Sequence, residues 1–251
     1  MEDEVIQAIE RALPRYRQYL TLIEPPARPL ISGNHAEHGG TVGFHLSGIV
    51  LWVVGVISST GVSTYCDLGS GTGHHGVASS CIVDQVPNNQ TGVILVEKNR
   101  HRIAFCNEWL SRLPPPTPRL ISSDYTNTDP GNLDYLSIFQ AAPLFLFLNN
   151  YNGIIGPEQT NRISELIDLL CPFGTVIASL DPILTQQPRW TVTHYQVNNV
   201  PRRELSWTAS NSPNGTLPTI VIYKYQKTDN ENHSRNRLLN DATIIDWPFH
   251  N

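Results

Sequence analysis

Lysine is scarce in this chain of 251 residues, and acidic side chains outnumber basic ones. Lysine occurs only as Lys98, Lys224 and Lys227, and the formal net charge is −5, with 17 basic and 22 acidic residues. A surface that binds nucleic acid needs clustered basic side chains. The composition therefore disfavours a large phosphate-binding surface.

Paired cysteines are also absent from the sequence. The four cysteines are scattered, with no Cys-x-x-Cys spacing: Cys66, Cys81, Cys106 and Cys171. Scattered cysteines are typical of free thiols in a reducing compartment, and a zinc site usually needs paired ligands. We therefore expect neither a disulfide framework nor a bound metal.

The chain has no apolar run long enough to cross a membrane. Its most apolar stretch, residues 42–57, contains His45 and Ser47 and is shorter than a membrane span, so we expect a buried helix. The first four residues, MEDE, are acidic and lack the apolar core of a secretion signal. We expect an intracellular protein, cytoplasmic or nuclear, without a membrane partner.

Three segments can be distinguished along the chain. Residues 1–60 begin with apolar side chains at helical spacing, interrupted by several prolines, and predict an N-terminal helical segment. Residues 61–227 alternate between strand-like and helix-like patterns. Residues 228–251 form a predominantly polar C-terminal tail.

The middle segment contains the pattern of an α/β fold. Apolar, β-branched runs and helical stretches alternate, and two further strands close the series. The runs lie at 63–68, 92–97, 119–123, 142–149 and 174–180, the helical stretches at 75–84, 99–112 and 158–171, and the closing strands at 193–198 and 218–226. This order predicts a Rossmann-like, mostly parallel seven-stranded sheet with helices on both faces.

A glycine-rich loop follows the first predicted strand. It reads Asp67-Leu68-Gly69-Ser70-Gly71-Thr72-Gly73. Glycines that connect a strand to a helix permit a tight turn and let a ligand approach the backbone, as in nucleotide sites. Residues 71–76, GTGHHG, also fit the dinucleotide pattern GxGxxG, which is weak evidence alone. A purely structural glycine turn is the third interpretation.

Three features favour S-adenosylmethionine (SAM) over a dinucleotide. Asp67 stands two residues before Gly69, where an acid can face the ammonium of the methionine part but would repel a pyrophosphate. About 60 residues precede the loop, whereas dinucleotide folds often begin with it. Glu97 ends the next strand, where a carboxylate can accept from both ribose hydroxyls, although NAD would use it equally. We expect SAM to contact Asp67, Gly69, Gly71, Gly73 and Glu97.

Asp124 comes at the end of the third predicted strand, and Tyr125 follows it. In this architecture the position lies beside the adenine, so Asp124 is predicted to accept from the exocyclic amine and Tyr125 to cover the purine face. The alternative is that Asp124 only caps a helix or stabilises a turn.

Several short motifs occur in the order of one known family. Residues 147–151, FLNNY, precede Gly156-Pro157-Glu158 and residues 174–179, GTVIAS. Gly39-Gly40-Thr41, Glu97-Lys98, Asp124-Tyr125 and Ser206-Trp207-Thr208 complete the series. Over residues 36–225 the chain resembles the Dot family (disruptor of telomeric silencing), the non-SET histone lysine methyltransferases within the class I SAM-dependent methyltransferases.

The resemblance implies an activity and further site residues. It implies that Thr41 belongs to a loop covering SAM, and that Asn149 contacts the cofactor or orients the nucleophile. Tyr151 and Trp207 would then border, with Asn149, a narrow channel for a lysine side chain. Phe147 is a further candidate wall, and a core position for it is equally compatible with the sequence. The implied substrate is a lysine of a protein.

The chain also departs from the family pattern. Gly40 replaces the usual acid, Asp181 stands where a lysine is expected, and the lysine-rich segment that holds DNA is absent. A nucleosome partner is therefore disfavoured by charge. A small-molecule N- or O-methyltransferase with the same fold remains the alternative, because a fold does not determine its substrate. A non-enzymatic binding module with this fold is a further hypothesis.

Overall fold

The computed structural model describes the central sheet and the helices beside it. The described residues are 64–73, 92–113, 117–127, 143–148, 155–183, 188–198, 220–229 and 243–246, with single positions between 7 and 18, at 76, 80 and 81, and at 138 and 139.

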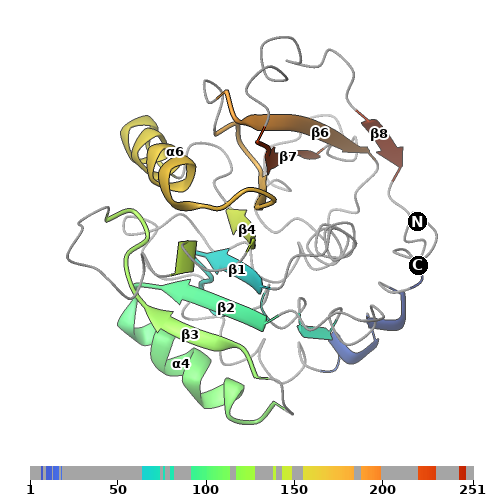
Figure 1. The fold of residues 1–251 in the computed structure, drawn as a ribbon. Coiled ribbons are helices and arrows are strands. Elements are labelled where there is room, and N and C mark those ends of the chain that lie inside the picture. Colours follow the sequence, from blue (N-terminus) through green and yellow to red (C-terminus); the bar gives the residue numbers. More distant parts are fainter. Residues whose placement is uncertain are drawn as a thin grey trace, which may run out of the picture.

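Within these residues, eight strands form one twisted sheet (Figure 1). The strands are β1 (Thr64–Leu68), β2 (Gly92–Glu97), β3 (Arg119–Ser122), β4 (Phe145–Leu148), β5 (Val176–Ser179), β6 (Trp190–Asn198), β7 (Ile220–Lys227) and β8 (Thr243–Asp246). Their order across the sheet is β3-β2-β1-β4-β5-β7-β6-β8. Strands β1 to β5 pair in parallel, whereas β7 runs antiparallel to both β5 and β6.

The predicted mostly parallel, seven-stranded topology is confirmed for β1 to β7, and β8 is an additional strand. It pairs in parallel with β6 and forms that edge of the sheet, and its residues 243–246 lie in the segment that the sequence led us to describe as a polar tail. The chain order reverses between β1 and β4, which lie side by side. Such a switch point opens a crevice at the carboxyl ends of the two strands, where ligands of open α/β sheets bind.

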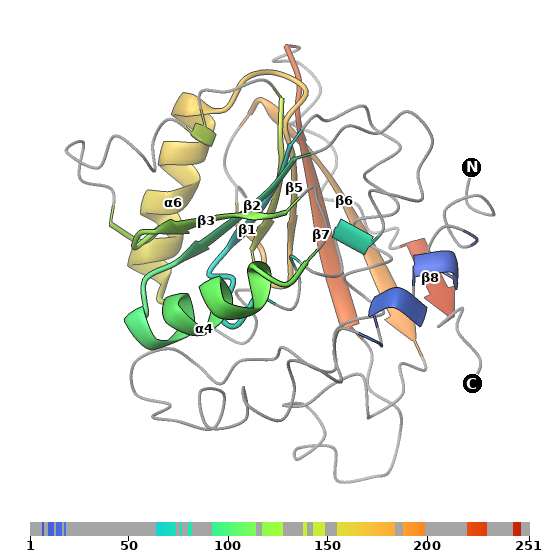
Figure 2. The ribbon, with the colours of Figure 1, turned by 90° about the horizontal axis from the view of Figure 1, so that it is seen from below.

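Two described helices cover opposite faces of the sheet, α4 (Arg100–Leu110) and α6 (Pro157–Leu170) (Figure 2). Successive strand residues point to opposite faces. In β1, Cys66 and Leu68 belong to the hydrophobic cluster that contains Ile163 and Ile167 of α6. Because both faces of the central strands are covered, these strands are apolar along almost their whole length.

Each helix begins at a clear capping signal. The side chain of Asn99 accepts hydrogen bonds from the backbone N–H groups of His101 and Arg102 at the start of α4. Helix α6 starts with Pro157 in its first position, where the missing N–H costs nothing. Helix α4 follows β2 and α6 follows β4, so the amino ends of both helices lie toward the carboxyl ends of the parallel strands, where the glycine loop also begins.

The first segment is helical at the positions that the structure describes, and Ala12 and Tyr16 are fully buried there. Of the helices in the described residues, none is both long and apolar enough to cross a bilayer. The same residues contain no group of three or more His, Cys, Asp or Glu side chains placed to hold a metal ion.

Candidate functional site

The glycine loop leaves the carboxyl end of β1 at the switch point. Gly69, Gly71 and Gly73 have φ angles of 80°, 59° and 83°. These angles lie in the left-handed region, which glycine adopts without a steric cost. Glycine therefore occurs at every second position of the loop because the backbone has a positive φ angle at each of these positions.

Most amides of this loop are already bound within the protein. The N–H groups of Gly69 and Ser70 both donate to the carbonyl of Val96 at 2.9 Å. The N–H of Gly73 donates to the carbonyl of Ser70 at 2.8 Å, and that of Gly71 donates to the carboxylate of Glu97 at 2.8 Å. A pyrophosphate site needs such amides to point at the ligand. These four amides are therefore not free to bind the phosphates of a dinucleotide.

Glu97 connects the end of β2 to the glycine loop and is 4% exposed. One carboxylate oxygen accepts from the backbone N–H groups of Lys98 at 3.0 Å and Asn99 at 2.8 Å, and the other accepts from Gly71. A carboxylate has about four acceptor positions. Three are taken by backbone donors, which leaves room for one ligand hydroxyl, and the contact with a second ribose hydroxyl stays a prediction.

Asp67 lies next to this carboxylate, near the end of β1 before the loop, and is fully buried. Burial, and secondly the charge of Glu97, raise the pKa of Asp67 from 3.8 to about 8. A buried acid with a raised pKa is stabilised in its charged form by a nearby cation. The position therefore suits a ligand that carries a positive charge.

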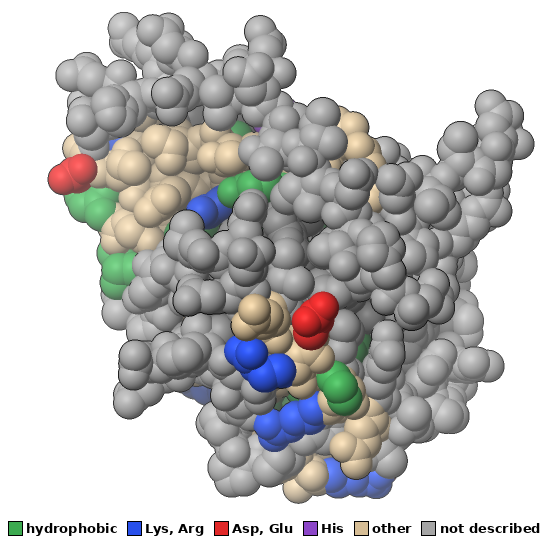
Figure 3. Space-filling model, turned by 90° about the vertical axis from the view of Figure 1, so that its right-hand side faces the viewer, with side chains coloured by type: hydrophobic (Ala, Val, Ile, Leu, Met, Phe, Trp, Pro, Cys, Tyr) green, Lys and Arg blue, Asp and Glu red, His purple; other side chains and the backbone are tan. Residues whose placement is uncertain are grey.

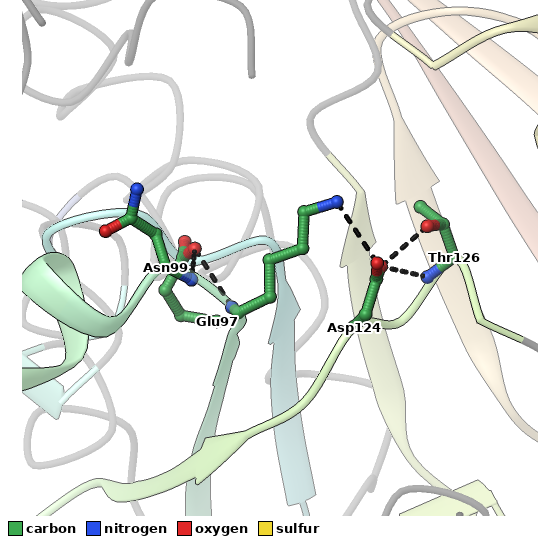
Figure 4. Close-up of polar contacts among 5 residues, drawn as sticks. Glu97, Asn99, Asp124 and Thr126 are labelled. Atoms are coloured by element: carbon green, nitrogen blue, oxygen red, sulfur yellow. Dashed lines mark hydrogen bonds and ion pairs between the residues drawn. The ribbon is translucent and has the colours of Figure 1, made fainter. Parts of the chain in front are cut away.

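Asp124 lies at the end of β3, in a polar cluster that also joins it to β2 (Figure 4). One carboxylate oxygen accepts from the N–H and the hydroxyl of Thr126, at 3.0 and 2.6 Å, and the other is 3.1 Å from the Lys98 ammonium. Partial burial alone would raise the pKa of Asp124, but the bonds from Thr126 and Lys98 hold it below the usual value. The turn-stabilising interpretation thus describes part of what this side chain does.

Tyr125 lies against the glycine loop. A β-carbon placed on Gly69 would be 2.9 Å from Cε1 of the Tyr125 ring, so the ring occupies the space that a side chain would need. Burial, followed by the charges of Glu97, Asp124 and Asp67, raises the pKa of the Tyr125 hydroxyl. The ends of β1, β2 and β3 therefore bring Asp67, Gly69, Glu97 and Tyr125 together.

The remaining predicted residues divide into two groups. Thr41, Asn149, Tyr151 and Trp207 lie outside the described residues, so their roles stay predictions. Phe147 is 1% exposed in the middle of the sheet, in register with Asp67 of β1 and Ala178 of β5, which corresponds to the core interpretation.

Two contacts of the loop were not anticipated from the sequence. Trp109 and Cys106 of α4 reach the carbonyls of Thr72 and Gly71. Their spacing of three residues on a helix signals only that they share a face, which is equally typical of core packing. The third glycine of GxGxxG, Gly76, also has a packing role, because a β-carbon there would be 2.2 Å from the Leu95 side chain.

Comparison with known proteins places the fold. By sequence, the chain matches no family model and no curated protein. By structure, it is similar to an O-methyltransferase from Bacillus cereus solved in complex with SAH (S-adenosylhomocysteine), with a TM-score of 0.50, 11% identity, and coverage of 88% of this chain and 91% of that one. Together with the strand order, this similarity gives the chain the Rossmann-like fold of the class I methyltransferases.

Two further similar structures have lower scores. One is a proposed O-methyltransferase from Klebsiella pneumoniae, with a TM-score of 0.48, 12% identity and coverage of 85% and 99% of the two chains. The other is an rRNA methylase from Streptococcus thermophilus, with a TM-score of 0.42, 15% identity and coverage of 75% and 98%.

Proposed function

We propose that this protein is a SAM-dependent methyltransferase. The observation that carries the proposal is the pair of buried acids, Asp67 and Glu97, on either side of a glycine loop whose amides are engaged. Buried carboxylates suit a ligand with a positive charge and hydroxyl donors, and they oppose a pyrophosphate. SAM carries an ammonium, a sulfonium and two ribose hydroxyls, so its donor groups match this site.

Each described residue has a distinct task in this proposal. Asp67 faces the ammonium of the cofactor, and Glu97 accepts from one ribose hydroxyl while it holds Gly71. Asp124 accepts from the adenine amine, and Lys98 and Thr126 fix its carboxylate for that purpose. Tyr125 covers the purine face beside Gly69. When bound, SAM supplies a methyl group on sulfur, and the protein holds the acceptor in line and excludes water.

For the methyl acceptor, we propose a small molecule with a nitrogen or oxygen nucleophile. The similar protein from Bacillus cereus is described as an O-methyltransferase bound to SAH, which supports both the cofactor and this class of acceptor. The net charge of −5 favours it over a nucleosome. Figure 3 shows one face of the protein, on which the described Lys and Arg side chains are coloured blue and the described Asp and Glu side chains red.

A protein lysine acceptor of the Dot type is the second candidate. Its support is the shared order of short motifs, including Gly156-Pro157-Glu158 at the start of α6 beside the carboxyl edge of the sheet. In this case Asn149, Tyr151 and Trp207 would border the lysine channel. Trp207→Ala would then lower turnover far more than cofactor affinity, whereas Asn149→Ala would lower both.

The experiment that tests the activity uses SAM labelled on its methyl group. The purified chain is incubated separately with small amines and phenols, free histones and nucleosomes, and the labelled products are identified by mass spectrometry. The proposal predicts label in the small-molecule pool. Label only in a histone lysine would select the Dot-type candidate, and salt-sensitive methylation of nucleosomes would refute the charge argument. If no pool takes up label while SAH binds, the binding-module hypothesis takes precedence.

A further inference from the structure

Gly71, in the middle of the glycine loop, is held through its backbone by side chains that are distant in sequence. Its N–H donates to Glu97 at 2.8 Å, and its carbonyl accepts from the thiol of Cys106 at 3.5 Å. Both contacts are buried, and they join positions 26 and 35 residues apart. The orientation of the peptide groups around Gly71 is thus determined by β2 and α4.

Trp109 holds the next part of the loop. Its indole N–H donates to the carbonyl of Thr72 at 3.0 Å, and the side chain is 6% exposed. A β-carbon on Gly73 would lie 2.5 Å from Cζ2 of the same ring. Gly73 therefore makes room for Trp109, in addition to permitting the positive φ angle that the loop needs there.

We propose that Trp109, assisted by Cys106, is a positioning residue that keeps the glycine loop in its cofactor-binding shape. This inference rests on the proposed SAM site, and it concerns the free protein as well as the bound one. Cys106 and Trp109 both act through carbonyl oxygens. The loop therefore keeps its shape without placing any of these side chains between the backbone and the ligand.

The physical reason is preorganisation. A loop with three glycines loses much conformational entropy when it is ordered, because glycine has more accessible backbone states than other residues. If α4 orders the loop during folding, the cofactor does not have to supply that free energy when it binds. Without the hydrogen bond from the Trp109 indole to the Thr72 carbonyl, the loop would be less ordered in the free protein. Part of the binding free energy would then be spent on ordering it.

The chain contains a matched control at the opposite edge of the sheet. Trp190 is 2% exposed, and its indole N–H donates to the side chain of Asp168 at 2.8 Å. Trp109→Phe and Trp190→Phe therefore remove the same donor from two buried indoles, and only the first lies against the glycine loop. A general effect of weakened packing would appear in both variants.

The test measures SAH affinity by calorimetry and stability by urea unfolding for the full chain and both variants. We expect Trp109→Phe to weaken SAH by roughly five- to thirtyfold, the equivalent of one buried hydrogen bond. Trp190→Phe should stay within twofold while its stability falls. If the parent binds SAH and Trp109→Phe binds equally well, this inference is overturned and the proposed function stands. If the parent does not bind SAH, both fail.

A spectroscopic readout separates positioning from general stability. The five tryptophans should give five indole N–H signals in a nitrogen-15 spectrum, and the two Phe variants assign those of Trp109 and Trp190. Added SAH should shift the Trp109 signal and leave the Trp190 signal in place. Equal shifts of both, or none at Trp109, would contradict the inference. If Trp109→Phe does not fold, Cys106→Ala serves as the variant, with a smaller loss of SAH affinity expected.

Discussion

Two buried polar clusters lie at opposite ends of the parallel strands of the sheet, and the surroundings of the buried ionisable groups differ between them. At the carboxyl edge, Asp67 and Glu97 place two acids close together, and the pKa of Asp67 is raised to about 8 by burial and by Glu97. At the other edge, Lys227 at the end of β7 is 4% exposed and surrounded by partners. A bound cation would stabilise the acid cluster, whereas Lys227 already has its interaction partners within the protein.

The lysine cluster closes the carboxyl end of α6. The Lys227 ammonium donates to the backbone carbonyls of Asp168 and, at 2.8 Å, of Cys171. It also lies 5.7 Å from the centre of the Trp190 ring and 5.9 Å from that of Phe173. A cation beside the final carbonyls of a helix is favoured by the helix dipole, and aromatic faces attract it further.

The comparison shows how a structural charge differs from a binding charge. Lys227 has acceptors and aromatic faces from four neighbouring residues, so it needs nothing from outside. In the acid pair, the like charge of Glu97 is a cause of the raised pKa of Asp67, so an added cation would relieve the repulsion. Substitutions in the acid cluster should therefore change ligand affinity most, and those in the lysine cluster should change stability.

Gly71→Val should give the largest effect. A β-branched side chain at a φ of 59° is strained, and both polar groups of this peptide are bound within the site. We expect SAH binding to be lost, with affinity reduced by more than about a hundredfold. Gly92→Val is the control, because Gly92 lies at the exposed start of β2, where an added β-carbon would meet nothing within 4 Å. Retained affinity in Gly71→Val would contradict the account.

Lys227→Met should lower stability without changing the ligand site. It leaves two carbonyls at the end of α6 without their donor and removes a buried cation from two rings. We expect the free energy of unfolding to fall by about 2–4 kcal/mol in urea denaturation. SAH affinity, measured well below the unfolding transition, should stay within twofold of the parent. A large loss of affinity would remove the distinction between the two clusters.

Glu97→Gln should lower SAM affinity and, to a lesser degree, destabilise the glycine loop. The amide keeps one acceptor oxygen but loses the charge that strengthens the bonds from Gly71 and from a ribose hydroxyl. With one acceptor position open to the ligand, we expect SAM affinity to fall by about 1.5–3 kcal/mol. Glu97→Ala should lose at least as much and also lose stability, because three backbone donors become unpaired. Unchanged affinity in both variants would remove Glu97 from the site.

The pH dependence should be smaller and specific to Asp67. Because its folded pKa of about 8 exceeds the ordinary 3.8, the folded state retains a proton that the unfolded state has released. The stability contributed by Asp67 is therefore complete below pH 3.8 and is lost as the pH rises toward 8. The slope reaches at most about 1.4 kcal/mol per pH unit.

Asp67→Asn should abolish that slope in unfolding curves recorded between about pH 5 and pH 8. In the parent, a bound ammonium favours the charged acid, so SAM binding at about pH 7 should release up to about one proton. Calorimetry in buffers with different ionisation enthalpies measures this release. An enthalpy that does not depend on the buffer would show that Asp67 is not linked to the ligand.

The sequence predicted the sheet and the acid cluster better than the lysine cluster, for a physical reason. Strands β1 to β7 and the loop are encoded by local patterns of apolar residues and glycines, which periodicity reveals. The burial of Lys227 depends on contacts with residues 56 and 59 positions away in the sequence. The contacts of Cys106 and Trp109 with the glycine loop join residues that are 35 and 37 positions apart. No local pattern contains such pairs.

Strand β8 and Asp124 illustrate two further limits. The four residues of β8 follow a long polar stretch, and so short an apolar run is not distinguishable from a loop by periodicity. For Asp124, the sequence allowed both a ligand contact and a turn, and the carboxylate accepts from Thr126 while it is paired with Lys98. Local side-chain bonds of Asp compete with other uses of the same oxygen atoms.

The most direct test of the central claim is calorimetric titration of the full chain with SAM, SAH and NAD under the same conditions. The engaged amides of the glycine loop and the acid pair of Asp67 and Glu97 predict that SAM and SAH bind at one site per chain and that NAD gives no binding heat. Binding of NAD without any signal from SAM or SAH would contradict the account.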